Sequence, residues 1–336
     1  MKFRDKEKAR YKSIKPILFS PEAQRDGNYR NIPRFFCLDD EHSEENLFAD
    51  IQKPAIDYFK QRRIGWHYGL AEGQKPSNHL CCSQCCCLNF LFPMTRRPDL
   101  LMIVFRKYYS DLVEPLTIDK DNPLTDGSFP YIGFEWIGVG DYLGETRRKG
   151  RNRTRGANYT SADFVLRFRR KDGEIQIVLG EWKYTEEYGE SDKGIEVRRQ
   201  NYNQAFHRKG GIFKRQDAEL YNALFFDPFY QLMRLQLLAQ EMEFNKEMDA
   251  DVVSVLYISP AENTELREGV TSPYLRKTYP KEDMFEIWKG LVPEDRFTRI
   301  STEKLLSTIT ESCGNTYTNW VDYLNTRYGW DKVSCT

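Results

Sequence analysis

Two acidic residues and a lysine stand at the ends of two neighbouring apolar runs. Glu181 and Lys183 follow the run 175–180, and Asp163 opens the run before it. The segment 171–173, Lys-Asp-Gly, is a hairpin turn signal, so the runs are expected to form two antiparallel strands. Alternate side chains of a strand share a face, which places Glu181 with Lys183 and lets the hairpin bring Asp163 close to both. Two carboxylates beside a cation suit a divalent-metal site for phosphodiester hydrolysis.

The residues around this triplet bear on a simpler alternative, a solvated ion pair at a strand end. Ile177 and Leu179 share a face with the charged side chains, while Val178 and Trp182 make the opposite face apolar as well. A strand that is apolar on both faces belongs at the centre of a sheet. Charged groups at its end are costly unless paired, and a bound metal would explain them.

The order of Asp163, a hairpin and Glu181-x-Lys183 resembles the motif of the PD-(D/E)XK nuclease superfamily, which has the restriction-endonuclease-like fold. The core motif covers roughly residues 160–184, with Ser161-Ala162 where the superfamily usually has a Pro. Two strings, Ser83-Gln84 and residues 181–186, are similar to an uncharacterised bacterial group of restriction-endonuclease-like proteins, which extends the similarity to about residues 45–260.

The resemblance implies catalytic roles for Asp163, Glu181 and Lys183. Asp163 and Glu181 would bind Mg²⁺ together with the main-chain carbonyl of Trp182, and Mn²⁺ is expected to substitute. Lys183 would orient or deprotonate the attacking water, or stabilise the pentacovalent state, and the sequence does not separate these roles.

Members of the superfamily often add an upstream acid to the metal site. Glu135 and Glu145 are both candidates, and each is equally well explained as an ion-pair partner. Gln84 and Gln231 are two further residues that could reach the site from helices, although interior amides of this kind are more often satisfied structural groups.

A basic run lies directly before the strand that opens with Asp163, and we expect it to bind the phosphate backbone of DNA. A solvated loop is the alternative. The six cations are Arg147, Arg148, Lys149, Arg151, Arg153 and Arg155. A second basic stretch, 198–215, contains Tyr202 and Phe206, whose rings could stack on bases.

The composition is that of an ordinary globular protein: 336 residues, formal net charge zero, 30% charged and 40% hydrophobic residues. No apolar run approaches the ~20 residues of a membrane span, and the charged N-terminus does not read as a secretory leader, so a cytoplasmic location without membrane contact is expected. Five of the eight cysteines lie within 81–87. Cys82-x-x-Cys85 fits half of a metal site, while the alternative is a buried helix over His79–Phe92 in which cysteine acts as a small hydrophobe.

The remaining pattern predicts an α/β protein with an αβββαβ core, a mixed central sheet flanked by helices, and extra N- and C-terminal helices. Residues 1–45 are interpreted as an extended or loosely packed arm, 46–260 as the nuclease domain, and 261–336 as a helical extension packed on the core. Expected helices cover 54–63, 98–112, 229–246, 280–291 and 302–310, and expected strands cover 131–137, 164–168, 175–182 and 251–258.

Together these features predict a Mg²⁺-dependent DNA endonuclease of the restriction type that acts in phage defence or DNA repair. Double-stranded DNA is the expected partner, and cutting both strands would favour a homodimer. The alternatives are a non-catalytic DNA-binding protein and a scaffold protein on the same fold.

Overall fold

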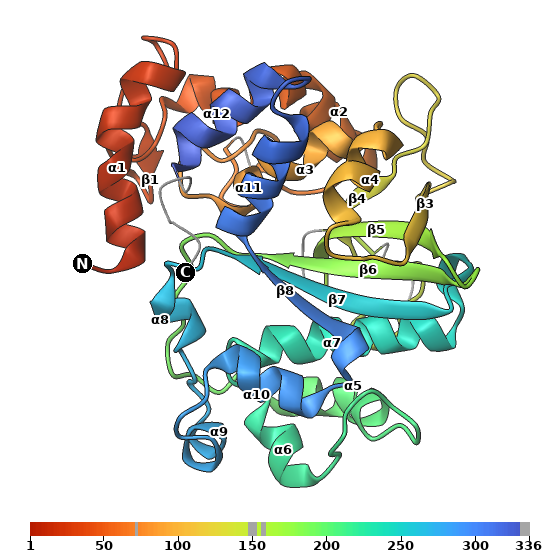
Figure 1. The fold of residues 1–336 in the computed structure, drawn as a ribbon. Coiled ribbons are helices and arrows are strands. Elements are labelled where there is room, and N and C mark those ends of the chain that lie inside the picture. The colour runs from red at the N-terminus through yellow and green to blue at the C-terminus, as the bar shows by residue number, and fades with distance from the viewer. Residues whose placement is uncertain (71–72, 147–152, 156–158, 330–336) are drawn as a thin grey trace.

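A six-stranded mixed sheet runs through the middle of the computed structural model, which describes residues 1–70, 73–146, 153–155 and 159–329 (Figure 1). The strand order is β3-β5-β6-β7-β8, with β4 also paired to β5. Strand β5 is antiparallel to each of its partners β3, β4 and β6, whereas β6, β7 and β8 run parallel to one another. The strands are β3 (Leu112–Leu116), β4 (Ile132–Trp136), β5 (Ala162–Arg170), β6 (Ile175–Trp182), β7 (Val252–Ser259) and β8 (Phe297–Ser301).

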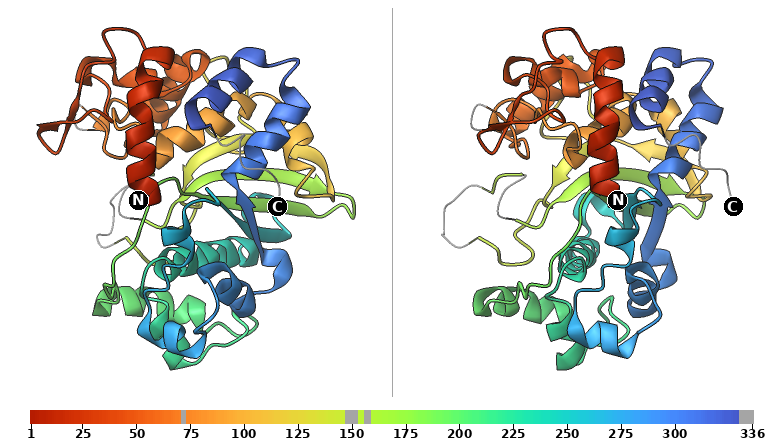
Figure 2. Two further views of the ribbon diagram at one scale, coloured as in Figure 1. Left: turned by 60° about the vertical axis from the view of Figure 1, so that its left-hand side comes forward. Right: turned by 90° about the vertical axis from the view of Figure 1, so that its left-hand side faces the viewer.

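Helices cover both faces of this sheet (Figures 1 and 2). On one face lie α1 (Phe3–Leu18), α2 (Gln52–Arg62), α3 (Ser83–Leu91), α4 (Pro98–Phe105), α11 (Thr302–Cys313) and α12 (Thr318–Tyr328). On the other lie α5 (Glu196–Phe206), α6 (Ala218–Ala223), α7 (Phe229–Phe244), α8 (Thr264–Arg267), α9 (Pro273–Thr278) and α10 (Met284–Leu291). The predicted fold class, a mixed α/β sheet flanked by helices, is confirmed.

The central strand β6 contributes to two separate cores, as its two-sided apolar pattern predicted. Val178 and Trp182 pack in the core with α3 and α12, while Ile177 and Leu179 pack in the core with α7 and α10. The bounds of β6 agree with the predicted strand, since every residue from Gln176 onward is buried and Gly173 makes the turn before it at φ +90°.

The N-terminal segment differs from the prediction of an extended or loosely packed arm, which is wrong over α1. This helix buries Phe3, Tyr11 and Ile14, and the Tyr11 ring is fully enclosed. The stripe also includes Glu7, which is buried and bonded to Arg10 (Oε1–Nε 2.9 Å). Because a charged residue occupies one of the buried positions, the apolar residues of α1 alone do not show a helical spacing.

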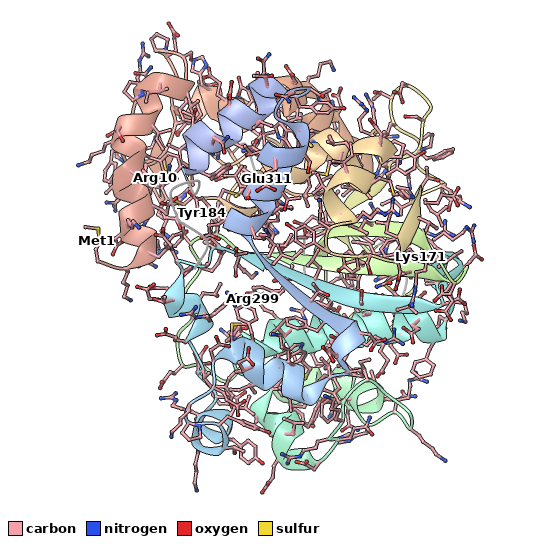
Figure 3. The ribbon with its side chains drawn as sticks, viewed as in Figure 1. Met1, Arg10, Lys171, Tyr184, Arg299 and Glu311 are labelled. Carbon is pink, nitrogen blue, oxygen red and sulfur yellow. The ribbon has the colours of Figure 1, made fainter. Side chains whose placement is uncertain are left out.

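Both ends of the described chain meet at Tyr184, two residues beyond β6. The Tyr184 hydroxyl lies 3.1 Å from that of Tyr11, and its ring centroid lies 5.8 Å from that of Tyr328 in α12. Arg10 donates to the carbonyl of Arg327 at 2.6 Å. Arg10 and Tyr184 are seen close together in Figure 3. Helices from the two ends therefore enclose the segment that follows the central strand.

The C-terminal residues are more than a helical extension. They supply β8, which pairs in parallel with β7 from Val255↔Phe297 to Ser259↔Ser301 and so extends the sheet at its edge. The expected helices of this segment are present as α10 and α11. Within the described residues, no helix combines the length and the apolarity needed to cross a membrane.

Two local expectations also need correction. The helix expected from Pro98 to Leu112 ends at Phe105, and β3 follows it. The segment expected as a helix from His79 begins its helix only at Ser83, since His79 pairs with Cys37 in an isolated β-bridge.

Candidate active site

The antiparallel register of β5 and β6 brings the two predicted acids together. Phe164 pairs with Gly180, so the next position places Asp163 opposite Glu181. This register needs a glycine, because a Cβ at Gly180 would lie 2.0 Å from the Phe164 ring. The Asp163 carboxylate accepts a hydrogen bond from the main-chain N–H of Trp182 at 2.6 Å.

Lys183 completes this group. Its Nζ lies 2.6 Å from Glu181 Oε1, and both side chains are about nine-tenths buried, with 11% and 9% exposure. The ion pair is therefore shielded from bulk water, unlike the solvated pair considered as an alternative.

The three residues line an open cavity of about 210 Å³ beside α7. Gln231, predicted as an additional site residue, also lines it, and its Oε1 accepts from the Tyr188 hydroxyl at 3.1 Å. The lining residues are His67, Glu135, Tyr159, Thr160, Ser161, Asp163, Glu181, Lys183, Gln231, Arg234 and Leu235. The segments that contribute them lie far apart in the sequence.

Of the two upstream acids, Glu135 lies in the cavity. The β4–β5 pairs on either side of it, Phe134↔Phe164 and Trp136↔Ala162, place Glu135 opposite Asp163. Its backbone has φ +50°, an unfavourable region for a residue with a Cβ in a strand. Such strain is held in place by surrounding contacts and is common at functional sites.

Polar side chains hold Glu135 in this conformation. Gln84 on α3 donates to Oε1 at 2.7 Å, Ser161 donates to Oε2 at 3.0 Å, and His67 Nε2 lies 3.7 Å from Oε1. The Gln84 side-chain oxygen in turn accepts from the main-chain N–H of His67 at 2.9 Å. The structure thus places Gln84 beside the cavity, where it orients an acid rather than lining the cavity itself.

Glu145 is not brought to the cavity. Its carboxylate accepts from the Thr160 N–H at 2.6 Å and from the Tyr202 hydroxyl at 2.7 Å. It also pairs with Arg234 at 3.2 Å. Glu145 therefore positions Arg234, whose guanidinium does line the cavity.

The electrostatics of the carboxylates favour a bound cation. Burial and the adjacent charge of Glu181 raise the pKa of Asp163 well above its usual range, which Lys183 offsets only in part. Burial lowers the pKa of Lys183, but the charge of Glu181, with Asp163 and other groups, outweighs it and leaves that pKa well above its usual range. The raised pKa of Lys183 favours its ammonium form, and a cation bound beside Asp163 would favour the ionised carboxylate and displace its proton to solvent.

The donor atoms suit a hard metal ion, since Asp163 and Glu181 offer only oxygens. Side chains in the described part of the chain form no group of three His, Cys, Asp or Glu that could hold a metal by itself. A metal held by Asp163 and Glu181 therefore needs main-chain or water oxygens to complete its ligand set, as the sequence-based expectation included.

The predicted phosphate-binding run is placed only in part. Arg147, Arg148, Lys149 and Arg151 lie outside the described residues. Arg153 donates to the carbonyl of Gly138 at 3.0 Å. Arg155 pairs with Asp119 at 3.1 Å and stacks over Trp136 at 4.4 Å. These two guanidiniums are thus engaged within the protein.

The second basic stretch does not present its aromatic rings. Tyr202 and Phe206 are 2% and 0% exposed and pack in the core beneath α5, so stacking of these rings on bases is excluded. The cysteines of 81–87 are likewise buried around α3, in accord with the buried-helix interpretation.

His67, Ser161 and Arg234 were not found from the sequence. Ser161 is adjacent to Asp163, but His67 and Arg234 reach the cavity from remote segments through tertiary contacts with Glu135 and Glu145. Local spacing carries no signal for such contacts.

The family model described as restriction endonuclease associating with ARP matches residues 12–329 of the chain. The chain belongs to this family. No curated protein and no solved structure matches it. The match covers α12 and the C-terminal part of α1, and membership supports a nuclease role for the chain.

Proposed function

We propose that the chain is a metal-dependent deoxyribonuclease of the PD-(D/E)XK type. The observation that carries the proposal is the buried group of Asp163, Glu181 and Lys183 at the adjoining ends of β5 and β6, inside a cavity that also holds Glu135. Asp163 and Glu181 would hold Mg²⁺, with main-chain or water oxygens completing the ligand set and Mn²⁺ as a substitute, while Glu135 contributes a further carboxylate to the cavity. The family description supports restriction-type cleavage of DNA.

A bound Mg²⁺ would act as a Lewis acid toward a phosphate oxygen and lower the pKa of water. The side chains of the cavity orient the reactants and stabilise the charge. Lys183 is kept protonated beside Glu181, so it acts as a hydrogen-bond donor and a positive charge, not as a general base. Its ammonium orients the attacking water and stabilises negative charge that develops on the phosphate.

The other residues of the cavity position these groups. Gln84, Ser161 and His67 fix the carboxylate of Glu135. Glu145 fixes Arg234, which supplies a second cation for a phosphate oxygen.

The test is cleavage of supercoiled and linear plasmid with Mg²⁺ or Mn²⁺, comparing wild type with Asp163→Asn, Lys183→Ala and the control Lys171→Ala. Lys171 is exposed in the β5–β6 turn and is labelled at the far end of the sheet in Figure 3. We expect metal-dependent cutting by wild type and the control, and a loss of at least about 100-fold in the two site variants, as for a lost transition-state donor. DNA binding without cutting under all conditions would instead favour a binding protein on this fold.

A further inference from the structure

A surface beside the cavity combines aromatic rings with cations. It is formed by α1, the two-stranded hairpin β1 (Asn28–Tyr29) and β2 (Ile32–Pro33), and the loop after α2. We call it the aromatic–basic surface, and it consists of Tyr29, Phe35 and Tyr68, backed by the buried ring of Phe36, with Lys8, Lys12, Arg30 and Arg34.

The cations of this surface are not neutralised. Lys8 and Lys12 lie over Phe36 and Phe35, 4.5 and 4.7 Å from the ring centroids. Within the part of the chain that the structure describes, none of the four cations forms an ion pair. In a chain with formal net charge zero, an unpaired cluster of this kind leaves a local positive field, which attracts a phosphate backbone.

Tyr68 is exposed to solvent on a strained backbone. Its residue surface is 70% exposed, and its backbone has φ +51°, an outlier for a bulky residue. Its ring meets that of Tyr29 edge-on at 5.9 Å. Arg30 at the hairpin tip also has positive φ, +54°, where Gly or Asn would be favoured. An exposed ring and a cation that both stand on strained backbone point to contact with a ligand rather than to stability.

The surface adjoins the cavity. Tyr68 directly follows His67, whose imidazole lies 3.7 Å from Glu135 Oε1 and lines the cavity. The strand β1 lies on the same face of the sheet as α3, whose Gln84 contacts Glu135 (Figure 1). A strand that leaves the cavity on this side would meet Tyr68 first and the cations next.

We propose that the aromatic–basic surface binds a single-stranded stretch of DNA next to the bond placed in the cavity. Tyr68 and Tyr29 provide faces and edges on which unpaired bases can stack, and Lys8, Lys12, Arg30 and Arg34 track the phosphates. Duplex bases are already stacked on one another, so an exposed ring at this point favours unpaired bases. This inference rests on the proposed nuclease function.

The experiment measures binding of a labelled single-stranded 20-mer and of the matching duplex by fluorescence anisotropy in EDTA, over a range of salt concentrations. The full chain is compared with Tyr68→Ala, with Arg30→Glu/Arg34→Glu, and with the control Lys107→Glu/Lys171→Glu. The control residues are exposed and form no ion pair within the described residues, and they lie near β3 and the β5–β6 turn, away from α1.

We expect Tyr68→Ala to weaken single-strand binding by roughly 5- to 150-fold, the loss expected for one stacked base. The charge reversal at Arg30 and Arg34 removes two phosphate contacts. The negative slope of log K against log salt should therefore become shallower by about 1.4, at about 0.7 per contact with a single strand. The control should change neither quantity, and all variants should keep the wild-type melting temperature.

The inference is overturned if Tyr68→Ala leaves single-strand binding unchanged, or if the control reversal weakens binding as much as the reversal at Arg30 and Arg34. Plasmid cleavage by wild type is measured in parallel. If wild type does not cut DNA, the proposed function fails; if it cuts while these variants bind normally, only the aromatic–basic surface is refuted.

Discussion

Asp163→Asn should make the metal-free protein more stable than wild type. In the folded protein, burial and the charge of Glu181 raise the pKa of Asp163, so its ionisation works against folding. Asparagine carries no charge and keeps an oxygen for the hydrogen bond from the Trp182 N–H, which spans 2.6 Å in the wild type. The substitution therefore removes a penalty without removing the contact.

The size of the effect follows from proton linkage. Wild type loses about 1.4 kcal/mol of folding stability for every pH unit between the unfolded pKa of Asp163 and its raised folded pKa. The loss begins near the unfolded value of about 3.9, grows as the pH rises through this interval, and is complete above the folded pKa. We expect Asp163→Asn to be more stable by at least ~1 kcal/mol at pH 8, and no more stable near pH 4.

Saturating metal should reverse this order. Mg²⁺ at 100 times its Kd adds about 2.7 kcal/mol to the wild type, whereas the variant lacks one of the two ligands and gains much less. The assay is urea denaturation followed by tryptophan fluorescence, at pH 4 and pH 8, with EDTA or with Mg²⁺. Asp322→Asn, an exposed carboxylate on α12, serves as the control and should stay within ~0.5 kcal/mol of wild type.

Two results would refute this reasoning. If Asp163→Asn is no more stable than wild type at pH 8 in EDTA, burial and the charge of Glu181 do not oppose ionisation of Asp163 in the folded state. If Mg²⁺ stabilises the variant as much as the wild type, Asp163 is not a metal ligand.

Three further substitutions test the packing and the polar contacts of the site. Lys183→Met leaves Glu181 buried without its cation and should lower the free energy of unfolding by about 3–5 kcal/mol at pH 8. The double variant Lys183→Met/Glu181→Gln should recover most of this loss, and a double variant as unstable in urea as the single one would contradict the ion pair. Gly180→Ala brings a Cβ within 2.0 Å of the Phe164 ring and should destabilise by about 1–3 kcal/mol, a loss that Phe164→Leu should partly relieve in thermal melts. Gln84→Leu frees Glu135 from its 2.7 Å hydrogen bond and should slow Mg²⁺-dependent plasmid cleavage by about 10- to 100-fold, so an unchanged initial rate would argue against a role for this contact.

The sequence predicted best where contacts are local. The central strand and the grouping of Asp163, Glu181 and Lys183 depend on one hairpin, so turn chemistry and strand alternation were enough to find them. Of the two glutamines proposed from helices, Gln231 lines the cavity, whereas Gln84 lies behind it and bonds Glu135.

Elements with weak or interrupted patterns were missed. The edge strand β3 contains Pro115, which argues against a strand, and β8 is a five-residue strand at the sheet edge with polar residues on its outer side. The buried Glu7 conceals the apolar face of α1. Long-range partners such as His67 and Arg234 have no local signature, since they are selected by the tertiary fold.

The enclosure of Tyr184 by helices from both ends of the chain has a consequence for synthesis. Tyr184 directly follows Lys183, and it packs against Tyr11 and Tyr328. When β5 and β6 have been synthesised, the chain already contains Tyr11 and the group of Asp163, Glu181 and Lys183, but not yet Tyr328. The contacts that enclose Tyr184, and with it the segment that carries Lys183, are therefore complete only after α12 has been synthesised.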